Sequence, residues 1–355
     1  MLKPHQISFF NHKGGVAKTT SAFNIGWKLA ELGKRVMLVD CDPQCNLTGL
    51  VLEYSQEEDY PFEGSRDQKP RNIRDGLAPA FDARPVQLAP VELQPVAERP
   101  GLLVLPGHVA LSENESTLSI AHELSSSLPA FQNIPGSLRH LINITGKEYN
   151  IDYAIVDMSP SLGAINQNLL CTSDSFVVPM APDFFSAMAL RSLSRVLPKW
   201  DAWSKKAANQ EILKNADYPW PDTSPKYLGS IVQNYRSRTR DGQEARPTKA
   251  YQRWFDALKE AKQKHLIPSL ENIGYLLEAD LYKSSEAKVE DFLLEVADFN
   301  SLIAISQDVS KPVFSLTKND VGSRGTVYEN QDKNIKKFNR TYEDGANKII
   351  KLTNG

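Results

Sequence analysis

The stretch ISFFNHKGGVAKTTSAFNIGWKLAELG, residues 7–33, joins a short apolar run to an amphipathic pattern through a glycine-rich turn. The apolar run stops at Asn11, and from Thr19 onward apolar residues recur at spacings of three and four, which predicts a helix that ends near Gly33. RVMLVD, residues 35–40, predicts a second buried strand. This βαβ unit predicts the α/β class: a mostly parallel, twisted sheet with helices on both faces.

The glycine turn has the residue types that a polyphosphate site requires. Open α/β sheets bind ligands at the carboxyl ends of their strands, where the next helix offers unpaired N–H groups to an anion. Glycines let the backbone approach phosphate, Lys18 is placed to reach the β- and γ-phosphates, and the Thr19 hydroxyl is expected to contact Mg²⁺. The expected nucleotide-binding residues of this loop are Gly14, Gly15, Val16, Ala17, Lys18, Thr19 and Thr20. The alternative is a plain turn before a packed helix, with two solvated lysines.

This loop departs from the ordinary P-loop pattern at two positions. Glycine would be required at positions 12 and 17, where the chain has His12 and Ala17, and it carries an extra lysine, Lys13. The segment KGGVAKTT resembles the deviant Walker A motif of the ParA/MinD family of P-loop ATPases, and is most similar to the ParA/Soj-type partition ATPases. The resemblance implies binding of ATP and Mg²⁺. It also implies that Lys13 reaches across a homodimer interface to the phosphates held by the partner subunit.

Further segments resemble the motifs of this family in the same order along the chain. VMLVDCDPQCNLTG (36–49) implies that Asp42 orients or activates the attacking water and that Asp40 lies near the metal. YAIVDMSPSLGAINQNLL (153–170) resembles the Walker B strand and implies that Asp157 holds Mg²⁺ through water, although Ser159 stands where the family usually has proline. The metal set so implied is Thr19, Asp40 and Asp157, and the catalytic set is Lys13, Lys18 and Asp42. Without the resemblance, an aspartate at a strand end more often caps a helix or a turn.

Two single positions also follow from the resemblance. Asn234, at the end of the apolar segment YLGSIVQN, is expected to hydrogen-bond the adenine edge. Position 17 usually holds glycine in the family, so the methyl group of Ala17 either is tolerated at negative φ or crowds the β-phosphate. We expect it to be tolerated at negative φ.

The organisation of the chain is expected to be one ParA-like domain over residues 1–355 with three insertions. Residues 51–100 carry seven of the 22 prolines, which excludes a continuous helix or a central strand and favours a surface excursion. The tryptophans of 199–225 are expected to pack locally, with a binding surface as the alternative. The amphipathic spacing in 254–300 is expected to pack against the body. The terminal YEDGANKIIKLTNG is expected to be only weakly amphipathic.

Composition limits the remaining classes. With 355 residues, 41% hydrophobic, 24% charged and a net charge of −2, the chain is typical of a soluble globular protein and is not broadly basic. Cys41, Cys45 and Cys171 are too few for a disulfide framework or a tetrahedral zinc site, which favours a reducing, cytoplasmic setting. No apolar run reaches the ~18 residues of a membrane span, and no signal peptide is recognised.

A local basic patch is the feature that points to nucleic acid. In NYRSRTRDGQEARPTKAYQRW, residues 234–254, basic residues outnumber acidic ones, as expected for contacts to phosphates without sequence readout. The candidates are Arg236, Arg238, Arg240, Arg246, Lys249 and Arg253. The alternative is a solvated, charged helix face.

The leading functional hypothesis is a ParA-like ATPase that closes into a homodimer on ATP and binds DNA nonspecifically. A partner adaptor then stimulates hydrolysis, which is otherwise slow, and a plasmid, chromosome or other cargo is partitioned or positioned. The alternative within the family is a positioning or regulatory ATPase that acts on a protein partner without DNA binding. An electron carrier with a bridging iron–sulfur cluster and a catalytically dead P-loop protein are the alternatives from other classes.

Overall fold

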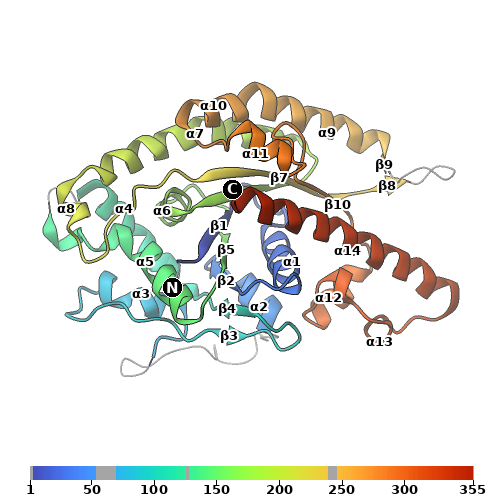
Figure 1. Ribbon diagram of the computed structural model, residues 1–355, viewed down its shortest axis with the longest axis horizontal. Coiled ribbons are helices and arrows are strands. Elements are labelled where there is room, and N and C mark those ends of the chain that lie inside the picture. Colours follow the sequence, from blue (N-terminus) through green and yellow to red (C-terminus); the bar gives the residue numbers. More distant parts are fainter. Residues whose placement is uncertain (1–2, 53–68, 125–127, 239–245, 355) are drawn as a thin grey trace.

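The computed structural model describes residues 3–52, 69–124, 128–238 and 246–354 (Figure 1). Its strands are β1 (His5–Phe9), β2 (Val36–Cys41), β3 (Gln94–Pro95), β4 (Leu102–Leu105), β5 (Tyr153–Met158), β6 (Ser175–Met180), β7 (Lys226–Tyr235), β8 (Ser237–Arg238), β9 (Arg246–Pro247) and β10 (Leu294–Ala297). Its α-helices are α1 (Lys18–Glu31), α2 (Asn46–Leu52), α3 (Ile73–Phe81), α4 (Asn114–Leu124), α5 (Ile134–Glu148), α6 (Ala164–Thr172), α7 (Phe184–Ala208), α8 (Glu211–Lys214), α9 (Lys249–Ala261), α10 (Ile267–Ile273), α11 (Ala279–Ser284), α12 (Leu302–Asp308), α13 (Lys318–Val321) and α14 (Gly325–Thr353). Shorter helical turns are η1 (Val109–Glu113), η2 (Pro129–Phe131), the π-turn η3 (Lys262–Leu266) and η4 (Val313–Ser315).

Eight strands form one sheet in the order β10-β7-β6-β1-β5-β2-β4-β3. All neighbouring pairs run parallel except β3 and β4. The first strand therefore lies in the middle of the sheet, between β5 and β6, and the glycine turn that follows it opens at the centre of the carboxyl edge. The predicted mostly parallel α/β fold is confirmed.

The strands are buried on both faces, and alternate residues of a strand belong to two separate hydrophobic cores. In β2, Met37, Val39 and Cys41 pack on one side with α3, α5, α6, α7 and α9, whereas Val36 and Leu38 pack on the other with α1 and α14. Period-two alternation of side chains explains this division. Helix α1 approaches β2 closely, since a Cβ at Gly26 would lie 2.5 Å from Leu38 Cδ2. Figure 1 shows α7, α9 and α10 along one side of the sheet and α1 with α14 along the other.

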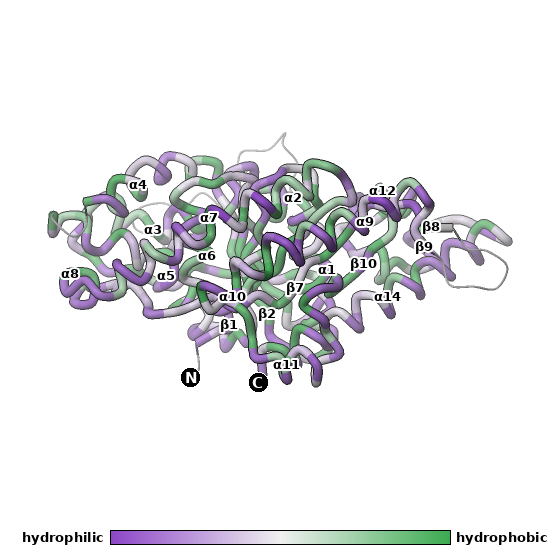
Figure 2. The backbone as a smooth tube through the Cα atoms, turned by 90° about the horizontal axis from the view of Figure 1, so that it is seen from above, coloured by the Kyte–Doolittle hydropathy of each residue, from purple (hydrophilic) through white to green (hydrophobic). Residues whose placement is uncertain are grey.

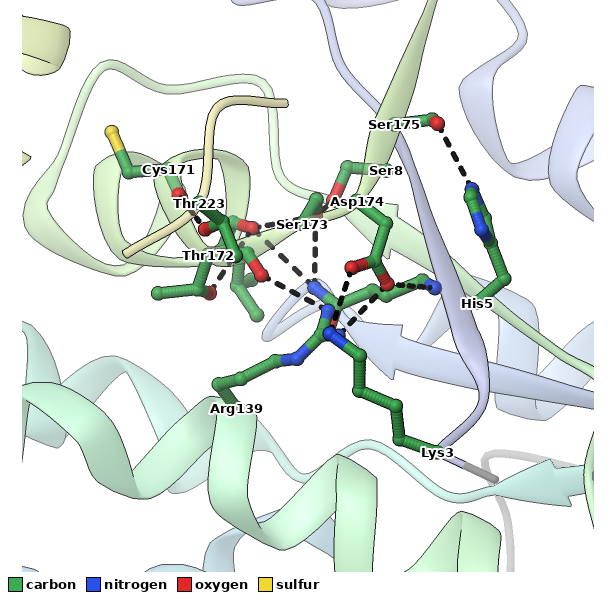
Figure 3. Close-up of polar contacts among 12 residues, drawn as sticks. Lys3, His5, Ser8, Arg139, Cys171, Thr172, Ser173, Asp174, Ser175 and Thr223 are labelled. Carbon is green, nitrogen blue, oxygen red and sulfur yellow. Dashed lines mark hydrogen bonds and ion pairs between the residues drawn. The ribbon is translucent and has the colours of Figure 1, made fainter. Parts of the chain in front are cut away.

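A polar cluster closes the amino edge of the sheet, opposite the glycine turn (Figure 3). Arg139 on α5 is 3% exposed and places its guanidinium 2.8 Å from Asp174 Oδ2, 2.9 Å from the Thr172 carbonyl and 3.1 Å from Gln6 Oε1. Asp174 Oδ2 also accepts the Gln6 amide at 2.8 Å. Burial raises the pKa of Asp174, but the Arg139 charge and these hydrogen bonds outweigh it, and the pKa is lowered overall. The cluster ties β1, α5, α6 and β6 together.

The proline-rich region behaves differently from the prediction. No continuous helix or central strand forms in the described part of 51–100, as expected, and Pro95 lies on the two-residue edge strand β3. For residues 69–100 the predicted surface excursion is wrong, however, because Ile73, Leu77 and Val91 are fully buried in the larger core; residues 53–68 lie outside the described part. Apolar residues between the prolines, rather than the prolines themselves, decide where this segment lies.

The other peripheral segments pack on the body. Trp203 and Trp220 meet edge to face at 4.9 Å, and Trp203 lies 4.1 Å from the His122 ring, which confirms local packing of the tryptophans. The expectation of a weakly amphipathic C-terminus is wrong, since that segment belongs to the 29-residue helix α14 with a continuous buried face. The buried residues of this face are Ile335, Phe338, Tyr342, Gly345, Ala346, Ile349 and Leu352.

Replacing Asp174 tests the amino-edge cluster. We expect Asp174→Asn to lower the free energy of unfolding at pH 7 by about 3 kcal/mol, because Arg139 would keep a buried charge without its partner. The pKa of Asp174 is lowered in the folded protein, so the stabilisation is present above the unfolded value of about 3.9 and is lost as pH falls through the folded pKa. Urea unfolding at pH 7, 4 and 3 measures it, with Asp344→Asn, an exposed ion-pair partner on α14, as control. Equal midpoints for D174N and wild type at pH 7 would contradict this role.

Candidate functional site

A cavity of about 840 Å³ opens at the carboxyl edge of the sheet. Its walls come from the β1–α1 loop, the loop and helix after β2, and single residues of three later segments. The lining residues are Gly14, Gly15, Val16, Ala17, Lys18, Thr19, Thr20, Asp42, Gln44, Cys45, Asn46, Gly49, Leu50, Val109, Pro160 and Gln307. The structure thus brings all seven predicted loop residues to one cavity, together with Asp42.

Helix α1 begins in this cavity, and no side chain in the part of the chain that the structure describes caps it. Its first amide groups therefore remain open to an anionic ligand, with the positive end of the helix dipole behind them. The expectation of negative φ at Ala17 is wrong: this residue has φ +55° and ψ +43°, the left-handed conformation that usually calls for glycine. An alanine here performs the backbone role of the glycine in the ordinary motif.

Lys18 is the buried cation of the site. It is 7% exposed, and its ammonium group lies 3.3 Å from the carbonyl oxygen of Lys13. Burial lowers the pKa of Lys18, and the negative charges of Asp157 and Asp42 act in the opposite direction. A buried ammonium group beside uncapped helix amides is suited to a polyphosphate, which would replace the lost hydration.

Asp157 is a buried carboxylate with unused acceptors. Neither carboxylate oxygen has a partner at hydrogen-bonding distance and angle among the described residues. Burial and the charge of Asp40 raise the pKa of Asp157 to about 8, although the nearby Thr19 hydroxyl and Lys18 partly offset the rise. An unsatisfied carboxylate beside a threonine hydroxyl fits Mg²⁺, which in phosphate sites takes few protein ligands and completes its shell with water and phosphate oxygens. In the described part of the chain, no group of three or more acidic, histidine or cysteine side chains forms a protein-only metal cage.

The two aspartates after β2 lie in different environments. Both oxygens of Asp40 accept hydrogen bonds from its own loop: Oδ2 from the Thr48 amide at 2.8 Å and hydroxyl at 2.7 Å, and Oδ1 from the Asp42 amide at 3.2 Å. Burial raises the pKa of Asp40 to about 6. Asp42 lines the cavity and accepts the Gln44 amide at 3.0 Å. Asp42 therefore faces the ligand space, whereas Asp40 anchors the loop and its predicted metal role rests on the resemblance alone.

Lys13 is held within its own chain. Its ammonium group forms an ion pair with Asp183, the N-cap of α7, and lies 3.3 Å from the Ser186 hydroxyl. The Lys13 amide donates to Asn11 Oδ1 at 3.0 Å, while Asn11 Nδ2 donates to the Pro179 carbonyl at 2.8 Å. The loop is thus fastened to β6 and α7, and Lys13 is not among the residues that line the cavity.

The loop after Asp157 is fastened by residues that sequence reasoning missed. Asn166 Nδ2 donates to the carbonyls of Ser159 at 2.8 Å and Ser161 at 2.9 Å. The Glu115 carboxylate accepts the amides of Ala164 and Ile165 at the start of α6. Glutamates favour helix N-termini, but no spacing in the sequence relates position 115 to a helix that begins 49 residues later.

Asn234 is not brought to the cavity. It lies exposed near the end of β7 with φ +62°, and it is not among the lining residues. The preceding residue, Gln233, is buried and reaches the phosphate loop instead. Gln307 of α12 and Leu50 of α2 also line the cavity, and the sequence did not single out either residue.

The basic candidates gather near one end of the molecule. Arg236, Lys249 and Arg253 are exposed, and Arg238 and Arg246 occupy paired positions on the β8–β9 ribbon. Arg240 lies outside the described residues. Figures 1 and 2 show β8 and β9 projecting at one end of the fold, beside the start of α9.

Comparison with known proteins agrees with this geometry. Residues 4–212 match the family model described as an AAA domain. The chain belongs to the ParA/MinD family of P-loop ATPases. It is 33% identical to the sporulation initiation inhibitor protein Soj of Bacillus subtilis over 196 residues, which cover 54% of this chain and 62% of Soj. It is 30% identical to the chromosome partitioning protein ParA of Caulobacter vibrioides over 194 residues, with the same two coverages. The matches thus span less than two thirds of these relatives.

Solved structures show the same fold over more of the chain. Protein DIP2308 from Corynebacterium diphtheriae aligns with a TM-score of 0.58 and 26% identity, over 86% of this ParA/MinD-family chain and 97% of that one. The pNOB8 ParA solved with nonspecific DNA aligns with a TM-score of 0.54 and 18% identity, over 99% of both chains. Within the described residues, no helix has the length and apolar character needed to cross a membrane.

Asp157 provides a test that needs no nucleotide. Its pKa of about 8 in the folded protein lies above the unfolded value of about 3.9, so the folded state keeps a proton that the unfolded state releases between these values. The stability of wild type should therefore fall as pH rises toward 8, and Asp157→Asn should remove this loss. We expect D157N to melt about 2 °C higher than wild type at pH 8.5, and with a smaller excess at pH 5.5.

Thermal unfolding across this pH range, without nucleotide or Mg²⁺, measures the effect, with Asp344→Asn as the control. In parallel, D157N should lose the Mg²⁺ dependence of nucleotide binding. If the difference in melting temperature between D157N and wild type were the same at every pH, burial would not raise the pKa of Asp157 in the folded protein.

Proposed function

We propose that this protein is an ATP-dependent dimerising switch that binds DNA nonspecifically in its ATP state and acts with an adaptor protein to partition or position a cargo. The observation that carries the ATPase assignment is the meeting of Lys18, Thr19 and the unsatisfied Asp157 at the uncapped start of α1. A buried ammonium group, a carboxylate without hydrogen-bond partners and open helix amides each cost free energy when no ligand is bound. A Mg²⁺–ATP complex would give all three groups a partner.

Each residue of the site has a defined task in this proposal. The amides of residues 14–20 and Lys18 bind the phosphates, and Thr19 and Asp157 hold Mg²⁺, which supplies charge neutralisation when bound. Asp42 orients the attacking water, since it lines the cavity and is free of the contacts that occupy Asp40. The described residues that line the cavity include no strong general base, so turnover without a partner is slow.

Lys13 supplies the dimer-dependent step. In one subunit it is paired with Asp183 and its side chain is 20% exposed. In the proposed ATP dimer it leaves Asp183 and contacts the phosphates bound by the partner subunit, where a cation supplied in trans stabilises the transferring phosphoryl group. Hydrolysis then requires two subunits, and loss of the dimer ends the ATP state.

The β8–β9 ribbon and the start of α9 form the proposed DNA contact. The backbone register of this ribbon pairs position 238 with position 246, and the sequence has arginine at both. Arg236 and Lys249 are exposed beside the ribbon in the sequence, and a polyanion such as DNA would neutralise their charges. Arg253 lies over the Trp254 ring at 4.9 Å, so this guanidinium is held on a surface helix next to the ribbon. The solved complex of pNOB8 ParA with nonspecific DNA supports this choice of ligand for a protein of the same fold.

One surface favours the alternative, a protein partner without DNA. Phe184, Phe185 and Met188, at the start of α7, are 53%, 66% and 50% exposed. Neighbouring exposed apolar side chains on a helix mark a protein contact more often than a nucleic-acid contact. A regulatory ATPase that docks a protein partner on this patch is therefore the second candidate.

Turnover of the site variants tests the ATPase assignment. We expect Lys18→Ala to lower nucleotide affinity and phosphate release at least about 100-fold, because it removes the buried cation. Asp42→Asn should keep nucleotide binding and lose turnover, since it changes the water-orienting group and not the phosphate loop. Phosphate release with Mg²⁺–ATP, and nucleotide binding by calorimetry, separate the two effects; Lys337→Ala, an exposed lysine on α14, is the control. Unchanged turnover in D42N would remove Asp42 from the mechanism.

DNA binding at several salt concentrations tests the second half of the proposal. With ATP, fluorescence anisotropy of duplexes of unrelated sequence should show similar affinities that fall steeply from 50 to 200 mM salt, and with ADP the binding should be weak. Removing Arg238 and Arg246 together should lower the slope of log K against log salt by about 0.9 for each lost phosphate contact, equally for every duplex. Lys337→Ala again serves as the control. No affinity in the ATP state at low salt would favour the protein-partner alternative.

A further inference from the structure

The left-handed conformation of Ala17 is held by an unusual number of hydrogen bonds. Its carbonyl oxygen accepts the Ser21 amide at 2.9 Å, the Ser21 hydroxyl at 2.8 Å and the side-chain amide of Gln233 at 3.1 Å. A single carbonyl rarely has three donors, since an oxygen offers two lone pairs. A non-glycine residue with positive φ persists only where its surroundings fix it, and this group of donors does so.

Gln233 reaches the loop from a strand that is two places away from β1 in the sheet. It lies on β7, 216 residues after Ala17, and is 1% exposed. Its side-chain NH₂ group donates both to the Ala17 carbonyl and to the Ser21 hydroxyl, which in turn donates to Ala17. This directional chain fixes the orientation of the amide, because the Ala17 carbonyl can only accept.

The other half of the Gln233 side chain is not satisfied. Its Oε1 is buried and has no hydrogen-bond partner among the residues that the structure describes. A leucine or methionine would fill the same space without an orphaned acceptor, so packing alone does not account for glutamine here. The donors toward Ala17 and Ser21 are the contacts that only the amide provides.

The conformation of Ala17 decides where the phosphate loop lies. Left-handed backbone at this residue turns the chain sharply between Val16 and Lys18, which keeps Gly14 and Gly15 at the cavity while α1 starts at Lys18. If Ala17 relaxed to the right-handed region, α1 would extend backwards and the glycines would leave the cavity wall. Alanine favours that relaxation by about 1–2 kcal/mol, whereas glycine does not.

We infer that Gln233 is a positioning residue that holds Ala17 in its left-handed conformation and so keeps the phosphate loop open to nucleotide. The amide contact from β7 takes the place of the glycine that the loop lacks. The inference rests on the proposed nucleotide site for its effect on binding, but its effect on the loop itself does not depend on nucleotide.

Rescue by a second substitution tests the inference. Gln233→Met keeps the size of the side chain and removes both donors; it should weaken binding of Mg²⁺–ADP about tenfold in calorimetry. In the Ala17→Gly background, Q233M should weaken binding less than about threefold relative to A17G alone, because glycine adopts positive φ without support. Gln94→Met, a half-buried glutamine on β3, is the matched control and should leave binding unchanged.

A nucleotide-free measurement separates this inference from the proposed function. Hydrogen exchange of peptides that cover residues 14–30, followed by mass spectrometry, should be faster in Q233M at the start of α1 and return to the wild-type rate in the double variant. If wild-type protein binds no nucleotide but the two variants differ from it in exchange as described, the proposed function is refuted and the inference stands. An equal loss of affinity in both backgrounds, or unchanged exchange in Q233M, would overturn the inference.

Discussion

Three carboxyl groups and one ammonium group are withdrawn from water at the carboxyl edge of this sheet. Asp40, Asp42 and Asp157 are at most 7% exposed, as is Lys18, and burial raises the pKa of Asp40 and Asp157 while lowering that of Lys18. Among the described residues, both Asp40 oxygens accept hydrogen bonds from the same loop, Asp42 Oδ1 accepts the Gln44 amide, and neither Asp157 oxygen has a partner. The fold therefore buries several ionisable groups at one place without fully pairing them. Clusters of ionisable groups with shifted pKa values are typical of ligand-binding and catalytic sites. The remaining features of the site follow from this burial.

The two edges of the same sheet illustrate the difference between stability and function. At the amino edge, Arg139 and Asp174 satisfy each other and also bond Gln6 and Thr172, so the polar groups form a closed network. At the carboxyl edge, no described residue is a hydrogen-bond partner of the Asp157 carboxylate, and no described side chain caps α1. Because parallel strands place all their carboxyl ends at one edge, the groups left open there can act on one ligand.

Sequence reasoning succeeded where the relevant residues are close together in the chain. The strand, turn and helix of residues 7–33 were predictable because their periodicity is local, and Lys18, Thr19, Asp42 and the strand of Asp157 follow motifs with short spacing. The partners of these residues were not predictable. Asp183 binds Lys13 from 170 residues away, and Glu115 caps a helix from another segment, so only the folded topology relates them. The burial of Ile73 and Leu77 was not predicted either, because the prolines around them suggested a surface segment.

Ala17 shows why a local rule failed at the site itself. Backbone propensity assigns alanine negative φ, and that expectation is sound for an isolated turn. Here the cost of left-handed backbone is about the size of one or two net hydrogen bonds, and the Ala17 carbonyl receives three donors, one of them from β7. Tertiary contacts of that number outweigh the preference of a single residue. A glycine at position 17 would adopt this conformation without these three hydrogen bonds. With alanine there, the conformation of the phosphate loop depends on β7, the strand that ends beside it, as well as on the loop's own sequence.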